Sequence, residues 1–179
     1  APTSAQRPVA TSRWNALGPS FALPFALVLD GQRTEHESVL RAVLYIKDRW
    51  FPLAGGTKYT HIPAMLPKRA GHKARSRWHE ALPRIVLRCY LLALRAHDTA
   101  RETLLASGRR RIAYQSPDPF LGTGITKPPT PIPPPEEWLS SSNRLGWALE
   151  ECRRLFREGD QAVDQELQVR SLMSFTSPA

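Results

Sequence analysis

The segment RIVLRCYLLALRA, at residues 84–96, constrains the fold most, because nearly every position in it is apolar. Such a run predicts a helix that crosses a hydrophobic core, and Pro83 suits the first turn of that helix. The run is too short, and too often interrupted by arginine, to span a membrane. At 179 residues, the chain is long enough for one compact domain around this helix.

On the N-terminal side of this helix, the sequence predicts a short strand and another helix. The stretch FALPFALVLDGQR (21–33) is prone to form a strand and contains the turn dipeptide Asp30-Gly31. From Glu37 onward, apolar residues recur with helical spacing until Pro52. Residues 52–77 combine glycine, proline and cations, which favours mostly loop.

On the C-terminal side, two more helices are predicted. Residues 98–108 carry capping-type residues, a short apolar body and a terminal glycine, and residues 109–116 follow as a short strand. The prolines of 127–138 favour an extended polyproline path. Residues 143–158 form an amphipathic pattern closed by a glycine, and 160–170 could continue as a polar helix.

These elements predict a mainly α fold, or α+β with a few short strands, in a single compact domain. The domain is expected over residues 20–159, with the Pro-rich excursion 127–138 on its surface. Residues 1–19 and 160–179 are expected to be an extended N-terminal arm and a C-terminal tail, because both are polar and short of apolar residues.

The positive charge of the chain is concentrated in one segment. Residues 68–111 have a net charge of +9, and the rest of the chain is neutral. This segment predicts either a face that meets phosphate or an acidic partner, or a solvated helix face with arginines at helical spacing. No zinc-finger, helix-turn-helix or aromatic RNA-binding signature accompanies it.

The remaining reactive residue types indicate neither a disulfide framework nor a metal site. Cys89 and Cys152 lie in helix-like apolar stretches, which is typical of buried free thiols in an intracellular protein. The first residues contain no apolar core of a signal peptide. The five histidines show no metal-ligand spacing, so neither a metal nor a cofactor is expected.

Six stretches occur in an order that resembles a known family. They are PFALVLDGQ, HESVLRAVLYIK, IPAMLPKRAGHKARSRWHEALPRIV, ARETLLASG, SPDPFLGTG and NRLGWALEECR. Together, over about 20–158, they resemble the NADAR (YbiA-like) family of N-glycosidases. The resemblance implies a mainly helical domain with small strands that cleaves N-glycosidic bonds in ribose-phosphate compounds. Substrates of that family include riboflavin-pathway intermediates and ADP-ribose attached to nucleobases.

The resemblance implies that Glu37, Trp78 and Asp118 occupy the positions of the family's active-site residues. One carboxylate would stabilise positive charge at the ribose or activate water, and the other would act on the leaving base. The indole would stack on a planar base.

Five further residues are expected to bind the substrate. Arg75 and Arg77 would hold its phosphate through bidentate hydrogen bonds. Phe120, Gly122 and Asn143 lie in or beside the motifs that carry the resemblance, and the same role is expected of them.

The sequence departs from the family pattern at the reactive lysine. The family helix reads E-H-x-x-x-A-x-K, but Ser38 replaces the histidine and Leu44 replaces the lysine. Lys47 is the nearest lysine, but a regular helix rotates it about 80° from Glu37. Lys47 is therefore expected to miss the pocket, and a Schiff-base route through this amine is expected to be lost.

Three other features bear on the same site. Leu121-Gly122 stands where the family has a Trp-Gly turn, and Arg77 replaces the aspartate before the tryptophan. In an alternative register, Glu35-His36 would match the family's Glu-His pair. The Glu37 register is favoured, because it keeps Ala42 and the apolar pattern that follows it in phase.

These observations predict a divergent NADAR-like domain that serves as a structural or binding subunit of a larger assembly, such as a virus particle. Its polar termini and Pro-rich segment would contact protein neighbours, and a ribose-phosphate or ADP-ribose-type ligand is a further partner. The alternative is an active, metal-independent N-glycosidase, and a third hypothesis is a nucleic-acid binder that uses residues 68–111. An intracellular location, virion-associated under the first hypothesis, is expected without any membrane partner.

Overall fold

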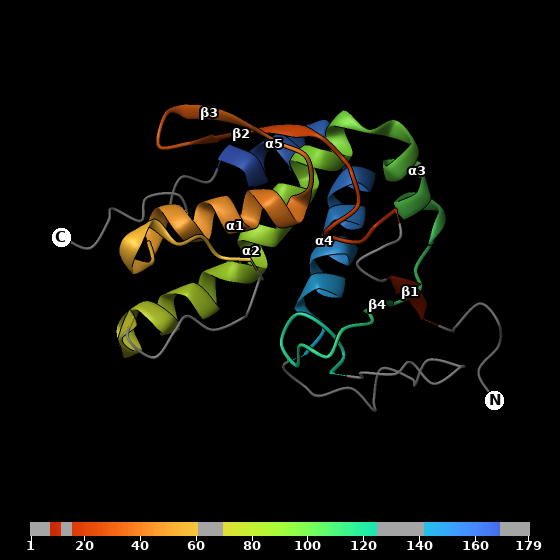
Figure 1. Cartoon of the computed structure of the whole chain (residues 1–179). Coiled ribbons are helices and arrows are strands. Elements are labelled where there is room, and N and C mark those ends of the chain that lie inside the picture. The colour runs from red at the N-terminus through yellow and green to blue at the C-terminus, as the bar shows by residue number, and fades with distance from the viewer. Residues whose placement is uncertain (1–7, 12–15, 61–69, 125–141, 169–179) are drawn as a thin grey trace.

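A computed structural model describes residues 8–11, 16–60, 70–124 and 142–168 (Figure 1). These residues form five α-helices, one short 3₁₀ helix and four short strands. The elements, in chain order, are β1 (Val9–Thr11), β2 (Phe25–Leu29), β3 (Gln32–His36), α1 (Val39–Trp50), η2 (Ala54–Gly56), α2 (His72–Ala96), α3 (Asp98–Ala106), β4 (Ile112–Tyr114), α4 (Arg144–Glu158) and α5 (Asp160–Gln168). The predicted mainly α class with a few short strands is confirmed.

Helix α2 is the centre of the fold, and α1, α4 and the strand β2 pack against it (Figure 1). The prediction that Pro83 opens this helix is wrong, because α2 begins at His72 and Pro83 lies inside it. Proline lacks the N–H that would bond to the carbonyl of His79, so the helix loses one hydrogen bond there. Buried residues on both sides of the proline, including Trp78 and Ile85, hold the two halves in one core.

The hairpin β2–β3 leads into α1. Strands β2 and β3 pair in antiparallel register, and Asp30 and Gly31 join them with φ angles of 51° and 76°. Two consecutive positive φ angles are what a two-residue hairpin turn of type I′ requires. Ser38 then caps α1, because its Oγ accepts a hydrogen bond from the backbone N–H of Arg41 at 3.3 Å. The predicted end of the helix before Pro52 is confirmed.

Part of the predicted N-terminal arm belongs to the domain. Strand β1 pairs in parallel with β4, and Val9 lies opposite Ile112. Leu17 is buried, and its carbonyl accepts a hydrogen bond from the hydroxyl of Tyr90 at 2.8 Å. These apolar residues and backbone groups therefore join the core instead of lying on the surface as an arm.

The C-terminal helices complete the fold. Helix α4 ends at Glu158 before Gly159, as predicted, and packs along α2. Residues 160–168, at the start of the predicted tail, form helix α5, which contacts both α2 and α4. Val163 of α5 is buried, and Ala162 and Leu167 pack against the core. Asp164 and Glu166 of the same helix form ion pairs with arginines of α2. Three predicted segments lie outside the described part of the chain: the Pro-rich excursion 127–138, residues 1–7 of the arm and residues 169–179 of the tail. The contacts with protein neighbours that we expect of these segments therefore stay predictions.

Two further sequence predictions concern the state of the cysteines and the presence of a membrane span. Cys89 and Cys152 are buried and unpaired, which confirms the predicted free thiols. Burial raises the pKa of Cys89 to about 12 and raises that of Cys152 well above its usual range. Among the described helices, none combines the length and the apolar character needed to cross a membrane.

Candidate active site

A lysine lies at the centre of the most unusual side-chain cluster in the core. Lys47 has no exposed surface although it is on α1, and its ammonium lies 4.3 Å from the centroid of the Tyr59 ring. The centroid of the Trp78 ring is 5.5 Å from the same atom. Two aromatic faces thus surround one buried amine, an arrangement that stabilises its charged form through cation–π interactions.

The aromatic residues of this cluster hold one another in place. The Tyr59 hydroxyl donates to the carbonyl of Phe51 at 2.9 Å, and the Tyr59 N–H donates to the carboxylate of Asp48 at 3.1 Å. The rings of Phe51 and Trp78 meet edge to face with centroids 5.9 Å apart. We call Lys47, Asp48, Phe51, Tyr59 and Trp78 the Lys47 site.

Burial tunes the acid–base chemistry of this amine. Desolvation lowers the pKa of Lys47 to about 8, and the nearby charge of Asp48 partly opposes that shift. A lysine with such a pKa exists partly as a neutral amine near pH 8, and the neutral amine is the nucleophilic form. The Lys47 site therefore has the electrostatic property of lysines that form imines with carbonyl compounds.

Lys47, which was expected to miss the pocket, lies beside Trp78. That expectation placed Glu37 on the same regular helix as Lys47, but α1 begins at Val39, so Glu37 lies outside it. On α1 itself, Lys47 follows Val43 by four residues and therefore shares its buried face. The Val39, Val43, Ile46 and Trp50 pattern could have identified Lys47 as a cation on an apolar face.

Glu37 lies on the surface. Its side chain is 72% exposed, and it forms an ion pair of 3.1 Å with Arg41 one helical turn away. In the alternative register, Glu35 is also exposed and paired with Arg33. His36 is more enclosed: its ring lies 5.0 Å from that of Tyr45, and burial lowers its pKa.

Asp118 organises the turn that follows β4. One carboxylate oxygen accepts hydrogen bonds of 2.8 Å from the backbone N–H groups of both Phe120 and Leu121. The backbone carbonyl of Asp118 accepts from the N–H of Gly122 at 3.0 Å. In the described structure, these bonds give Asp118 the role of an aspartate that closes a turn.

Gly122 and Asn143 connect this turn to β4 and α4. A Cβ atom at Gly122 would lie 2.6 Å from the Cβ of Ser116, so only glycine fits there. The Asn143 side chain accepts from the N–H of Tyr114 and donates to the carbonyl of Ile112, both at 2.8 Å. Asn143 is buried, and these two bonds occupy its oxygen and one amide hydrogen.

Phe120 brings the Asp118 turn against the half of α2 that carries Trp78. Its ring centroid lies 4.0 Å from that of His79, and the guanidinium of Arg144 lies 5.9 Å from the same ring. Trp78 and Asp118 therefore lie on two segments that pack together.

The two arginines that were expected to bind phosphate differ in their exposure. Nε of Arg75 is buried without a hydrogen-bond partner among the described residues, whereas Arg77 is exposed.

The sequence motifs indicate one part of the site and miss another. They identified the two segments that carry Trp78 and Asp118, and Phe120 of the second segment packs against His79 of the first. They did not identify Lys47 and Tyr59 as neighbours of Trp78. Tyr59 follows a Gly-Gly pair in a stretch without periodicity, so no sequence signal places its ring.

The basic segment is partly neutralised within the fold. Carboxylates on α3, α4 and α5 pair with five of its arginines, which are Arg84, Arg88, Arg95, Arg101 and Arg111. Internal pairing reduces the charge that these positions offer to an extended polyanion. Among the described residues, no three or more His, Cys, Asp or Glu side chains are grouped as metal ligands.

Comparison of the chain with protein-family models, curated proteins and solved structures finds no match.

Proposed function

We propose that the chain is a NADAR-like, metal-independent N-glycosidase in which Lys47 is the reactive amine. The observation that carries this proposal is the burial of Lys47 between Tyr59 and Trp78, with its pKa lowered to about 8. A flat indole beside the amine suits a planar base or the face of a ribose ring. The proposed substrate is a ribose-phosphate or ADP-ribosyl compound with a nitrogen-linked base.

The proposed reaction conserves atoms with water as the only co-substrate. The neutral amine of Lys47 attacks C1′ of the ribose, the bond from C1′ to the base breaks, and the amine proton passes to the base. Opening of the ribose ring converts the resulting glycosylamine into an imine. Water then adds to the imine, releases the sugar phosphate and restores the amine.

Two arginines would supply charge for the phosphate. Arg75 carries a buried Nε without a hydrogen-bond partner, and Arg144 lies against the Phe120 ring. Guanidinium groups bind phosphate through paired hydrogen bonds, so these two arginines are the proposed phosphate ligands. The Tyr59 ring lies over the amine, and its segment would move aside to admit the sugar.

Release of free base tests the proposal. Purified protein would be incubated at pH 8 with ADP-ribosylated guanine nucleotides, ADP-ribose and ribosylaminopyrimidine phosphates, and bases would be separated by chromatography. Lys47→Arg and Lys47→Met should lower the rate by at least about a thousandfold, because both remove the nucleophile. Lys58→Arg, at an exposed lysine, is the matched control and should keep the wild-type rate.

Two results would reject this reaction. Full activity of Lys47→Arg would exclude the amine as nucleophile, and absence of base release by wild type from every substrate would exclude the glycosidase. Circular dichroism of each variant separates loss of chemistry from loss of fold.

A second candidate function is that of a binding or structural subunit in a larger intracellular assembly, such as a virus particle. The observation that favours it is that Glu37 is paired on the surface and Asp118 closes a turn, so neither carboxylate is free for acid–base chemistry. Light scattering coupled to size-exclusion chromatography tests it. A protein that stays monomeric up to high concentration, and that releases base, would count against this role.

A further inference from the structure

A hollow lined by arginines lies beside α4, on elements other than those of the Lys47 site. Its volume is about 370 Å³, within the range of small-ligand sites. Side chains from α4 and from the turn after α3 line it: Arg109, Glu150, Arg153, Arg154, Arg157 and Glu158. Four arginines face two glutamates, so the lining has a net positive charge.

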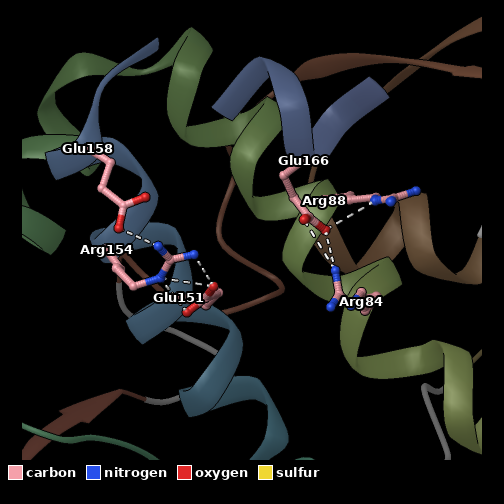
Figure 2. A network of polar contacts seen from close by, with 6 residues as sticks. All are labelled: Arg84, Arg88, Glu151, Arg154, Glu158 and Glu166. Carbon is pink, nitrogen blue, oxygen red and sulfur yellow. Dashed lines mark hydrogen bonds and ion pairs between the residues drawn. The ribbon is translucent and has the colours of Figure 1, made fainter. Parts of the chain in front are cut away.

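The glutamates of this arginine hollow are already paired. Glu150 accepts two hydrogen bonds from Arg111, at 2.9 and 3.1 Å, and a third from the backbone N–H of Ile112 at 2.7 Å. Glu158 and Glu151 both pair with Arg154, as Figure 2 shows. Arg154 is thus neutralised twice over, although it lines the hollow.

The other three arginines of the hollow have no carboxylate partner within the described residues. Arg153 is buried, and its Nη1 donates to the hydroxyl of Ser107 at 2.6 Å. Arg157 donates to the backbone carbonyls of Leu105 and Gly108, at 3.3 and 2.7 Å. Bonds to neutral acceptors fix these guanidinium groups in place but leave their charges uncompensated.

The electrostatics of Arg153 point in the same direction. Burial chiefly lowers its pKa, Glu150 opposes the shift, and the charges of Arg157 and Arg110 lower the pKa further. A bound anion would relieve this repulsion between guanidinium groups. Arg95 and Arg101, by contrast, have carboxylate partners on α5 and α3.

We propose that the arginine hollow binds the phosphate or diphosphate group of a small molecule, with Arg109, Arg153 and Arg157 as its ligands. Hydrogen bonds hold Arg153 and Arg157 in place, and Arg109 lines the same hollow. Three neighbouring guanidinium groups match the several oxygens of a phosphate better than they match the two oxygens of a carboxylate. The small concave volume suits one such group. Internal pairing of Arg84, Arg88 and Arg95 reduces the charge that the C-terminal half of α2 offers to a nucleic-acid backbone.

Titration calorimetry of the full chain with sodium pyrophosphate, at low ionic strength, tests this site. We expect saturable binding with one site per chain. Arg109→Gln and Arg157→Gln should each weaken it on the order of tenfold, the effect of losing one charged hydrogen-bond donor. Arg154→Gln is the matched control, because this residue lines the same hollow with its charge neutralised, and it should change the affinity less than threefold.

The comparison ligands are inorganic phosphate and a single-stranded RNA of twelve nucleotides. Phosphate should bind more weakly at the same site, and RNA should not compete with pyrophosphate. The proposal is overturned if pyrophosphate does not saturate, if Arg154→Gln weakens binding as much as Arg109→Gln, or if RNA binds and displaces pyrophosphate. If Arg157→Gln fails to fold, Arg109→Gln still decides the outcome, because no hydrogen bond from Arg109 to another described residue supports the turn. Base release at Lys47 is measured separately, so either site can fail alone.

Discussion

Replacing Glu166 by glutamine should destabilise the fold far more than a typical surface mutation. Figure 2 shows Glu166 of α5 between two arginines of α2. The Glu166 carboxylate lies 3.1 Å from Nη1 of Arg84 and 3.5 Å from Nε of Arg88. The Arg88 side chain is only 7% exposed, and none of its three guanidinium nitrogens has a hydrogen-bond partner.

The size of the effect follows from these two environments. The pair with the half-exposed Arg84 is worth about 0.5 kcal/mol. Removing the one carboxylate that the described residues place beside a buried guanidinium costs about 3–5 kcal/mol, and the lower end applies here because the 3.5 Å contact is not a hydrogen bond. Glu166→Gln should therefore lower the free energy of unfolding by about 3 kcal/mol. The corresponding fall in Tm is roughly 6–12 °C for a chain of this size.

Urea unfolding followed by far-ultraviolet circular dichroism measures the loss. The matched control is Glu158→Gln, which removes an exposed partner of Arg154 on α4 and should cost only about 0.3–0.5 kcal/mol. A second change isolates the cause. Arg88→Met in the Glu166→Gln background removes the buried charge and should bring stability back to within about 1 kcal/mol of wild type.

A loss for Glu166→Gln no larger than that for Glu158→Gln would contradict this prediction, because burial of Arg88 would then be energetically unimportant. Absence of recovery by Arg88→Met in the Glu166→Gln background would also contradict it, because the loss would then come from another contact of α5.

Three further predictions concern the core. Lys47→Met should be more stable than wild type by about 3 kcal/mol at pH 7, because the pKa of Lys47 falls from 10.5 in the unfolded chain to about 8 in the fold. Folding disfavours the charged amine, so this advantage should shrink as the pH rises from 8 to 10.5, which urea unfolding at a series of pH values would detect. Gly146→Ala should lower stability by about 2–3 kcal/mol in thermal melts, although alanine usually favours a helix, because its Cβ would lie 2.1 Å from the carbonyl oxygen of Ile112. Cys89 and Cys152 should resist a thiol reagent in native protein and react fully in urea, since both are buried with raised pKa values; fast labelling of native protein would contradict this.

Periodicity and turn chemistry predicted much of the fold. The apolar run of α2, the Asp30-Gly31 turn and the glycine after α4 each have a local physical signal, and the structure contains all three. The start of α2 was misplaced, because Pro83 has the same local preference for a first turn whether or not a helix precedes it. Burial of Trp78 and its neighbours extends the helix, and that depends on tertiary packing.

The candidate site was harder to predict, because its central residue breaks the usual pattern. A lysine among apolar residues is most simply a surface cation, and only its spacing from Val43 and Trp50 on α1 indicates burial. The neighbour Tyr59 comes from a loop, and periodicity carries no information there. The ion pairs of the basic segment were also not predictable from local sequence, because Arg84 and Arg88 both pair with Glu166 of α5, about eighty residues later in the chain.

Reductive trapping of an imine tests the reactive amine most directly. The protein would be incubated at pH 8 with ribose 5-phosphate and cyanoborohydride, digested, and mapped by mass spectrometry. The account predicts one adduct per chain on Lys47, little on the exposed Lys58 and Lys73, and none on Lys47→Arg protein. Modification of the solvent-exposed Lys58 and Lys73 without modification of the buried Lys47 would contradict the proposal that Lys47 is a catalytic nucleophile.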